Sequence, residues 1–223
     1  MAAFDLTPVV GVVDQGNPQA YGTNQLMRLS PYKHQFVDQV GPRWAELVRM
    51  GKVFAASGGV VANAIAPVVD MPTTANIHGL YNGNSVASNI CLAIIKVSTY
   101  AASGTLGLGR AMIGCVSGGA QSAKPSAGTG VVGPNNLLPT STNASNAVMG
   151  TGTALTTAGA WQVLGGLDTP AAVEIGAGLS ADVEGMFIVP PTYVFGLHVL
   201  APLGTTAKFL GTIIWAEYQI IPQ

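Results

Sequence analysis

The sequence predicts an all-β protein of two packed antiparallel sheets, preceded by an N-terminal arm and one short α-helix. Short segments rich in Val, Ile and Leu recur along the chain, and Gly, Pro and Asn turn signals separate them. Only one segment has the spacing of an amphipathic helix. The 223 residues fit a single domain of this class, and two sheets packed face to face bury such strands.

Residues 1–52 are expected to form the arm and the helix. The first 34 residues mix short apolar pieces with Gly, Pro, Asn and Gln, which is typical of an arm laid across a neighbouring subunit. Apolar residues within 35–50 follow helical spacing. Because proline favours the first turn of a helix and glycine its end, the helix itself is predicted from Pro42 to Met50, with Gly51 ending it.

Residues 53–223 are expected to form the sandwich. Asn82-Gly83 is a strong turn signal. The Gly-, Ser-, Thr- and Asn-rich residues 118–159 are too long for an ordinary connection and are expected to be an excursion that orders against a partner. Such a crossing favours a jelly-roll-like sandwich over a meander. Strands are predicted at 53–56, 60–66, 89–100, 108–116, 160–164, 171–175, 183–189, 193–200 and 208–220.

The predicted strands hold most of the aromatic residues. In the last strand Ile213, Trp215 and Glu217 share one face. Aromatic residues are only 7% of the chain, and in strands their expected role is core packing. A carbohydrate-binding tail or receptor module is an alternative function. Such a site would need exposed aromatic rings, and its candidate residues are Trp161 and Tyr193.

The chain is unusually poor in charge. Charged residues make up 9% of it, against about 25% in average soluble domains. So few charges protect a free chain poorly against association. The apolar run 59–69 is too short for a membrane-spanning helix. We therefore predict a surface covered by partners, with a homo-oligomer, most simply a trimer, and no membrane.

The basic residues are unevenly spread, and five of the nine lie between residues 28 and 52. They are predicted either to form a docking surface for an acidic neighbour or to be a solvated helix face. Nucleic-acid binding is not predicted, because the net charge is −1 and no basic strip is interleaved with aromatic residues. The candidate docking residues are Arg28, Lys33, Arg43, Arg49 and Lys52.

No catalytic signature emerges from the motifs, and no enzyme activity or cofactor is predicted. Residues 128–133 match G-x-G-x-x-G, but Pro134 follows where a phosphate-binding helix would begin. No G-x-S-x-G elbow occurs. Asp182 and Glu184 lie two residues apart, but they are expected to be a solvated strand edge.

Metal binding and disulfides are not predicted either. The three histidines share no ligand spacing, and they are His34, His78 and His198. An ion on a symmetry axis, held by Asp168, Asp182 or His78, stays an open possibility. Residues 1–8 lack the pattern of an export signal, so Cys91 and Cys115 are expected to be free thiols.

The C-terminal pattern is similar to that of jelly-roll subunits of bacteriophage particles. The similarity lies in residues 189–193 (VPPTY), 196–199 (GLHV) and 209–212 (FLGT), then 215–218 (WAEY), with 80–83 (LYNG) in the same style. The resemblance implies a virion structural protein made in the host cytoplasm. A trimeric cement or decoration protein that clamps the major capsid protein is the favoured form, and a major jelly-roll capsid protein is the alternative. It implies no binding residues.

Overall fold

The computed structural model describes residues 44–58, 61–70, 76–106, 109–120, 131–132, 134–154, 160–169, 178–201 and 206–219. The chain divides into two compact units, Met1–Ala45 and Glu46–Gln223, and the strands that the structure describes all belong to the second unit. The short helix is α1 (Ala45–Arg49), and two single 3₁₀ turns are η1 (Val61–Asn63) and η2 (Val86–Ser88).

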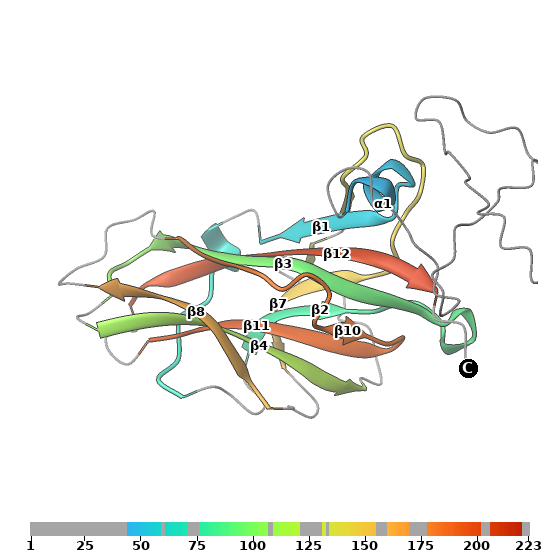
Figure 1. The fold of residues 1–223 in the computed structure, drawn as a ribbon. Helices are drawn as coiled ribbons and strands as arrows, with labels where there is room; N and C mark the ends of the chain where they lie inside the picture. Colours follow the sequence, from blue (N-terminus) through green and yellow to red (C-terminus); the bar gives the residue numbers. More distant parts are fainter. Residues whose placement is uncertain are drawn as a thin grey trace, which may run out of the picture. The chain divides into compact units, whose positions relative to one another are not determined.

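The strands form two six-stranded antiparallel sheets. The first contains, in order, β10 (Ile188–Val189), β3 (Ile90–Ser103), β12 (Lys208–Gln219), β1 (Val53–Ser57) and β6 (Asn135–Asn136), with β9 (Gly178–Asp182) also paired to β3. The second contains β5 (Val131–Val132), β7 (Val148–Ala154), β2 (Asn76–Tyr81), β11 (Tyr193–Leu200), β4 (Gly109–Ala120) and β8 (Gln162–Thr169). Figure 1 shows β1, β3 and β12 in one layer above β2, β4 and β11.

The strand order is that of a jelly roll. One sheet holds the run β1-β12-β3-β9 and the other the run β2-β11-β4-β8, so the first strand lies beside the last and the second beside the next to last. Taken over these eight strands alone, every connection crosses between the sheets except the one from β4 to β8, which begins and ends in the same sheet. Two four-stranded sheets linked in this way are a double Greek key. The predicted all-β sandwich is confirmed.

The core lies between the sheets and is rich in aromatic side chains. Trp215 of β12 stacks on Phe54 of β1, with ring centroids 6.1 Å apart. Phe187 and Phe195 meet edge to face at 5.3 Å. Ile213, Trp215 and Glu217 are all buried, as expected for residues on one inward face of the strand.

Helix α1 is shorter than the predicted 42–50, and residues 35–43 lie outside the described part of the chain. Its end is where the sequence placed it. Gly51 has a φ of 64°, its N–H donates to the carbonyl of Val48 at 2.8 Å, and the N–H of Lys52 donates to that of Leu47 at 2.9 Å. A left-handed glycine with this pair of bonds closes a helix by satisfying its last carbonyls.

Two predicted strands are wrong. In the 60–66 segment the chain forms η1, and only Ile65 makes an isolated bridge, with Phe209 of β12. In the 183–189 segment only Ile188 and Val189 are extended, because a bulge in β3 interrupts the edge. The carbonyl of Ile95 accepts from the N–H groups of both Val183 and Glu184 at 2.9 Å, so the segment turns before it can pair again as β10.

The segment 118–159 contains more regular structure than its composition suggests. It holds the end of β4, all of β5 and β6, and β7, which pairs along its length with β2. Neither β2 nor β9 was predicted, and the strand predicted at 160–164 begins later, as β8. The strand predicted at 171–175 lies outside the described residues.

Candidate interaction surface

Two of the five candidate docking residues lie in the described part of the chain. Arg49 donates two hydrogen bonds to the carboxylate of Glu46 on the same helix, the shorter at 2.6 Å, and both side chains are exposed. The hydrogen bond from Arg49 lowers the pKa of Glu46. Lys52 is exposed at the start of β1. Arg28, Lys33 and Arg43 fall outside the described residues, so the docking surface stays a prediction.

Four of the charged residues on the sandwich form ion pairs across neighbouring strands. Lys96 and Asp182 are opposite each other on β3 and β9, and their charged atoms are 3.1 Å apart. Arg110 and Asp168 are opposite each other on β4 and β8, at 3.3 Å. Opposite charges facing each other across a ladder stabilise the pairing by roughly 0.2–1 kcal/mol.

The side chains considered as ligands for an ion are paired or buried in this structure. Asp168 and Asp182 each lie against a cation, and His78 is buried in the sandwich. Among the residues that the structure describes, no three His, Cys, Asp or Glu side chains are grouped as metal ligands.

Two histidines are buried and neutral. His78 points into the core, where its Nε2 lies 3.0 Å from the carbonyl oxygen of Phe209, and its Nδ1 has no hydrogen-bond partner. Burial lowers the pKa of His78 to about 4. His198 accepts a hydrogen bond at Nδ1 from the N–H of Val199. Its pKa is lowered to about 4, first by burial and then by the positive charge that His78 would carry when protonated in acid. At neutral pH both rings act as packing groups.

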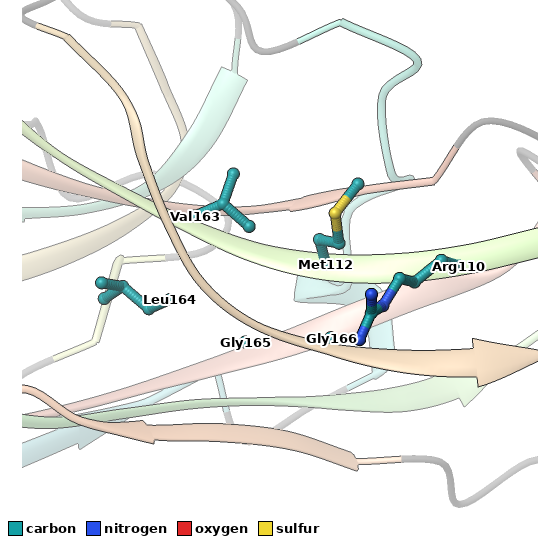
Figure 2. Close-up of a pocket in the computed structure, with 6 residues that line it drawn as sticks. All are labelled: Arg110, Met112, Val163, Leu164, Gly165 and Gly166. Carbon is teal, nitrogen blue, oxygen red and sulfur yellow. The ribbon is translucent and has the colours of Figure 1, made fainter.

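A shallow, open groove of about 300 Å³ runs along β4 and β8. Figure 2 shows the side chain of Arg110 reaching toward the backbone of Gly166 on β8, with Met112 and Val163 farther along the groove. The six lining residues are Arg110, Met112, Val163, Leu164, Gly165 and Gly166. The only charged group among them is the guanidinium already paired with Asp168, so the groove offers no nucleophile and no acid–base pair.

The two aromatic residues proposed for glycan binding have different surroundings. Trp161 packs, half-buried, against a small apolar cluster on the outer face of the β2-β11-β4 sheet, beside Gly196. Tyr193, at the start of β11, is 37% exposed. Trp161 therefore fits the expected packing role, whereas Tyr193 presents its ring at the surface.

Three long stretches of the sequence contain no charged residue and meet at one end of the sandwich, where the carboxylate of Glu217 on β12 accepts a hydrogen bond from the hydroxyl of Ser145. The sequence contains no Asp, Glu, Lys or Arg in 71–95, 125–167 or 185–207. A network of amide side chains, buried at Asn82 and Asn84, joins these three stretches where β2 ends. Asn82 donates from Nδ2 to the carbonyls of Ile90 and Val189, both at 2.9 Å. Its Oδ1 accepts from the amide of Asn84, whose own Oδ1 accepts from Asn146 at 3.1 Å.

The same network ties in the start of β11. The backbone N–H of Asn82 donates to the carbonyl of Tyr193, and its carbonyl accepts from Thr192, both at 2.9 Å. A side chain at Gly83 would overlap the carbonyl oxygen of Asn146, so glycine is needed there for close approach. Asn82-Gly83 thus links the two sheets and does not close a two-residue hairpin between paired strands.

Exposed apolar side chains lie on the segments that this network joins. Val86 is 71% exposed, Ile188 44% and Tyr193 37%. We call residues 82–89 and 186–193 the uncharged end. The sequence reasoning found the turn at Asn82 but missed this surface. The three stretches without charge were the available signal, and only the fold brings them together.

No protein-family model matches this chain, and no curated protein sequence matches it. Among the described helices, none is both long enough and apolar enough to cross a membrane.

Proposed function

We propose that this chain is a structural, non-catalytic subunit of a bacteriophage particle, made in the host cytoplasm and incorporated into the virion. In this role it oligomerises, most simply as a trimer, and docks on the major capsid protein as a cement or decoration protein. The observation that carries the proposal is the uncharged end, where Val86, Ile188 and Tyr193 are exposed on segments that an amide network joins to each other.

The distribution of charge supports assembly over a free existence in solution. Fully buried interface cores are depleted in charged residues, whereas soluble monomers rely on charge to remain apart. Two of the ion pairs lie across β-ladders, which leaves little charge to repel a neighbour there. The fold does not decide the function, because jelly rolls occur in capsid proteins, in lectins and in enzymes.

The docking residues predicted from the sequence fit the second half of the proposal. Arg49 and Lys52 are exposed near the start of β1, beside the charge-free stretch 125–167, because Asn143 donates to the carbonyls of Met50 and Gly51. A basic surface suits an acidic neighbour such as another shell protein, while an uncharged surface suits a partner without charge. The roles of major capsid protein and of carbohydrate-binding module stay alternatives.

Density-gradient purification tests the proposal. Particles released from cells that make this chain are banded, and the protein content of the band is determined by mass spectrometry. The proposal expects the chain in the particle band with the major capsid protein. A chain that stays entirely in the soluble fraction, while the capsid protein is banded, contradicts it.

A further inference from the structure

We propose that the outer face of the first sheet, where β9, β3, β12 and β1 lie side by side, binds a neutral glycan. The face carries an exposed tyrosine ring, Tyr100, beside four hydroxyl groups that cross the four strands in one line. We call these four residues the hydroxyl row, and they are Ser180, Ser98, Thr212 and Ser57. The inference goes beyond the proposed function, because it assigns a ligand to the chain and does not depend on incorporation into a particle.

The register of the strands places the hydroxyl row in line. Ser98 of β3 lies opposite Ser180 of β9 on one side and opposite Thr212 of β12 on the other. Thr212 in turn lies opposite Ser57 of β1. Figure 1 shows β12 between β1 and β3 in the upper layer. Residues opposite each other in a ladder point to the same face of the sheet, and neighbouring strands are about 4.8 Å apart, so the row is roughly 14 Å long.

The hydroxyl row points away from the core. Its neighbours Val97 on β3 and Ile213 on β12 are fully buried between the sheets. Because side chains alternate between the two faces of a strand, the row must face outward. Its two end members are exposed and its two middle members are half-buried. The hydroxyl of Thr212 donates to that of Ser57 at 2.9 Å. Since each hydroxyl donates one hydrogen bond and accepts two, the row keeps capacity for a ligand.

The exposed ring of Tyr100 stands beside the row. Tyr100 follows Ser98 by two residues on β3, about 7 Å along the strand, and it is 54% exposed. Its ring lies against β9, where a side-chain carbon at the opposite residue, Gly178, would meet it at 3.4 Å. Half-buried Leu210 lies opposite it on β12. The ring is therefore supported by its neighbours and open to solvent. Tyrosine offers a rigid contact area at low entropic cost, and serine offers adaptable hydrogen bonds.

The chemistry of the face selects a glycan as the occupant. A sugar carries hydroxyl groups that pair with the row and an apolar C–H face that packs on the ring of Tyr100. A protein partner, a second copy included, would have to satisfy all four hydroxyl groups, because a buried hydroxyl without a hydrogen bond costs about 1–3 kcal/mol. Single small molecules bind in concave sites, whereas this face is an open sheet. The row therefore suits a chain of linked sugars.

The charges on these four strands cancel, which favours a neutral glycan. Lys96, two residues before Ser98, forms an ion pair with Asp182 of β9 at 3.1 Å. The strands contain two other charged residues. Lys208 is exposed at the start of β12, and Glu217 is buried and bonded to Ser145. An acidic or a basic sugar would find no excess of opposite charge on these strands.

The test uses an array of immobilised oligosaccharides that includes neutral bacterial and plant glycans as well as sialylated and phosphorylated ones. The wild type is compared with Tyr100→Ala, with Tyr100→Phe and with the double variant Ser98→Ala, Ser180→Ala. Tyr193→Ala is the matched control, because Tyr193 is 37% exposed on the other sheet. Circular dichroism and thermal melting confirm that each variant is folded, as expected for positions that are exposed or half-buried.

We expect the wild type to bind at least one neutral glycan. On that glycan Tyr100→Ala should raise the dissociation constant about fivefold to tenfold, because the sugar loses its apolar platform. The double serine variant should raise it about fivefold or more, through lost hydrogen bonds. Tyr100→Phe, which keeps the ring, and Tyr193→Ala should bind as tightly as the wild type.

Several results overturn the inference. They are binding to no neutral glycan, binding to acidic glycans alone, and binding that Tyr100→Ala and the double serine variant leave intact. Binding that only Tyr193→Ala removes moves the site to β11. If no glycan binds and Tyr100→Ala lowers the native mass of an oligomer in light scattering, the face is a contact between copies. None of these results decides whether the chain enters particles, so the proposed function stands or falls separately.

Discussion

Acid should destabilise the fold through His78. The ring is 1% exposed, and its Nε2 lies 3.0 Å from the carbonyl oxygen of Phe209, which fixes the proton of the neutral ring on Nε2. Protonation would place a second N–H at Nδ1, which has no partner, in the interior of the sandwich. Burial therefore lowers the pKa of His78 from 6.5 to about 4.

The sign and the size of the effect follow from linkage. Since the folded pKa lies below the unfolded one, the unfolded chain takes up the proton first as the pH falls. The contribution of the neutral His78 ring to stability is fully present above pH 6.5 and is lost as the pH falls to about 4. A pKa difference of this size corresponds to about 3 kcal/mol of unfolding free energy for His78 alone. His198, with its pKa also lowered to about 4, acts in the same window.

Urea unfolding followed by tryptophan fluorescence at a series of pH values measures this loss. His78→Gln removes the titrating group, and the variant should lose about 3 kcal/mol less stability than the wild type between about pH 7 and pH 4. The variant need not be as stable as the wild type at neutral pH, because only the change with pH is compared. An equal loss in the wild type and in His78→Gln would refute the reasoning.

Three further predictions concern the uncharged end and a buried thiol. Asn82→Ala should lower the unfolding free energy by about 3 kcal/mol in urea titrations, because the carbonyls of Ile90 and Val189 lose their donors; a change within error would show that water replaces the amide. Thr192→Gly should stabilise the protein by roughly 0.5–1 kcal/mol and so raise its melting temperature, since glycine adopts the left-handed conformation without strain. A lower melting temperature would mean that the threonine side chain contributes more stability than its backbone strain costs. Cys115, whose pKa burial raises to about 12, should not react with a thiol reagent until the protein unfolds; reaction in the native state would contradict its burial.

The strands that the sequence predicted well are the long ones with many β-branched residues. Strands β11 and β12 have clear alternation and lie between proline-containing breaks, and both begin at the predicted residue. Strand β7 was missed because its two glycines and its alanine have little intrinsic preference for a strand. Pairing with β2 stabilises it, and that partner lies far away in the sequence.

The bulge at Ile95 shows a second limit of sequence reasoning. The apolar residues of 183–189 have the composition of a strand, but the doubled hydrogen bond at the Ile95 carbonyl breaks the edge with which they pair. The residues 183–189 themselves carry no signal of the bulge at Ile95 in β3. The pattern of a segment predicts its own preference, whereas the partner strand decides its register.

The candidate surface was predictable only in part. The low charge of the chain indicated a covered surface, and Asn82-Gly83 indicated a turn. The location of the surface depends on three stretches that meet only in the folded sandwich, joined by Asn82, Asn84 and Asn146. The ion pairs across β4–β8 and β3–β9 likewise join residues far apart in the sequence.

The most direct test of assembly as the function is the copy number of this chain in purified particles. Quantitative mass spectrometry against labelled peptides gives the ratio of this chain to the major capsid protein in independent preparations. Assembly at defined sites predicts a constant ratio that corresponds to a whole number of oligomers in a symmetric shell. A ratio that varies between preparations, or particles that lack the chain, would contradict a structural role.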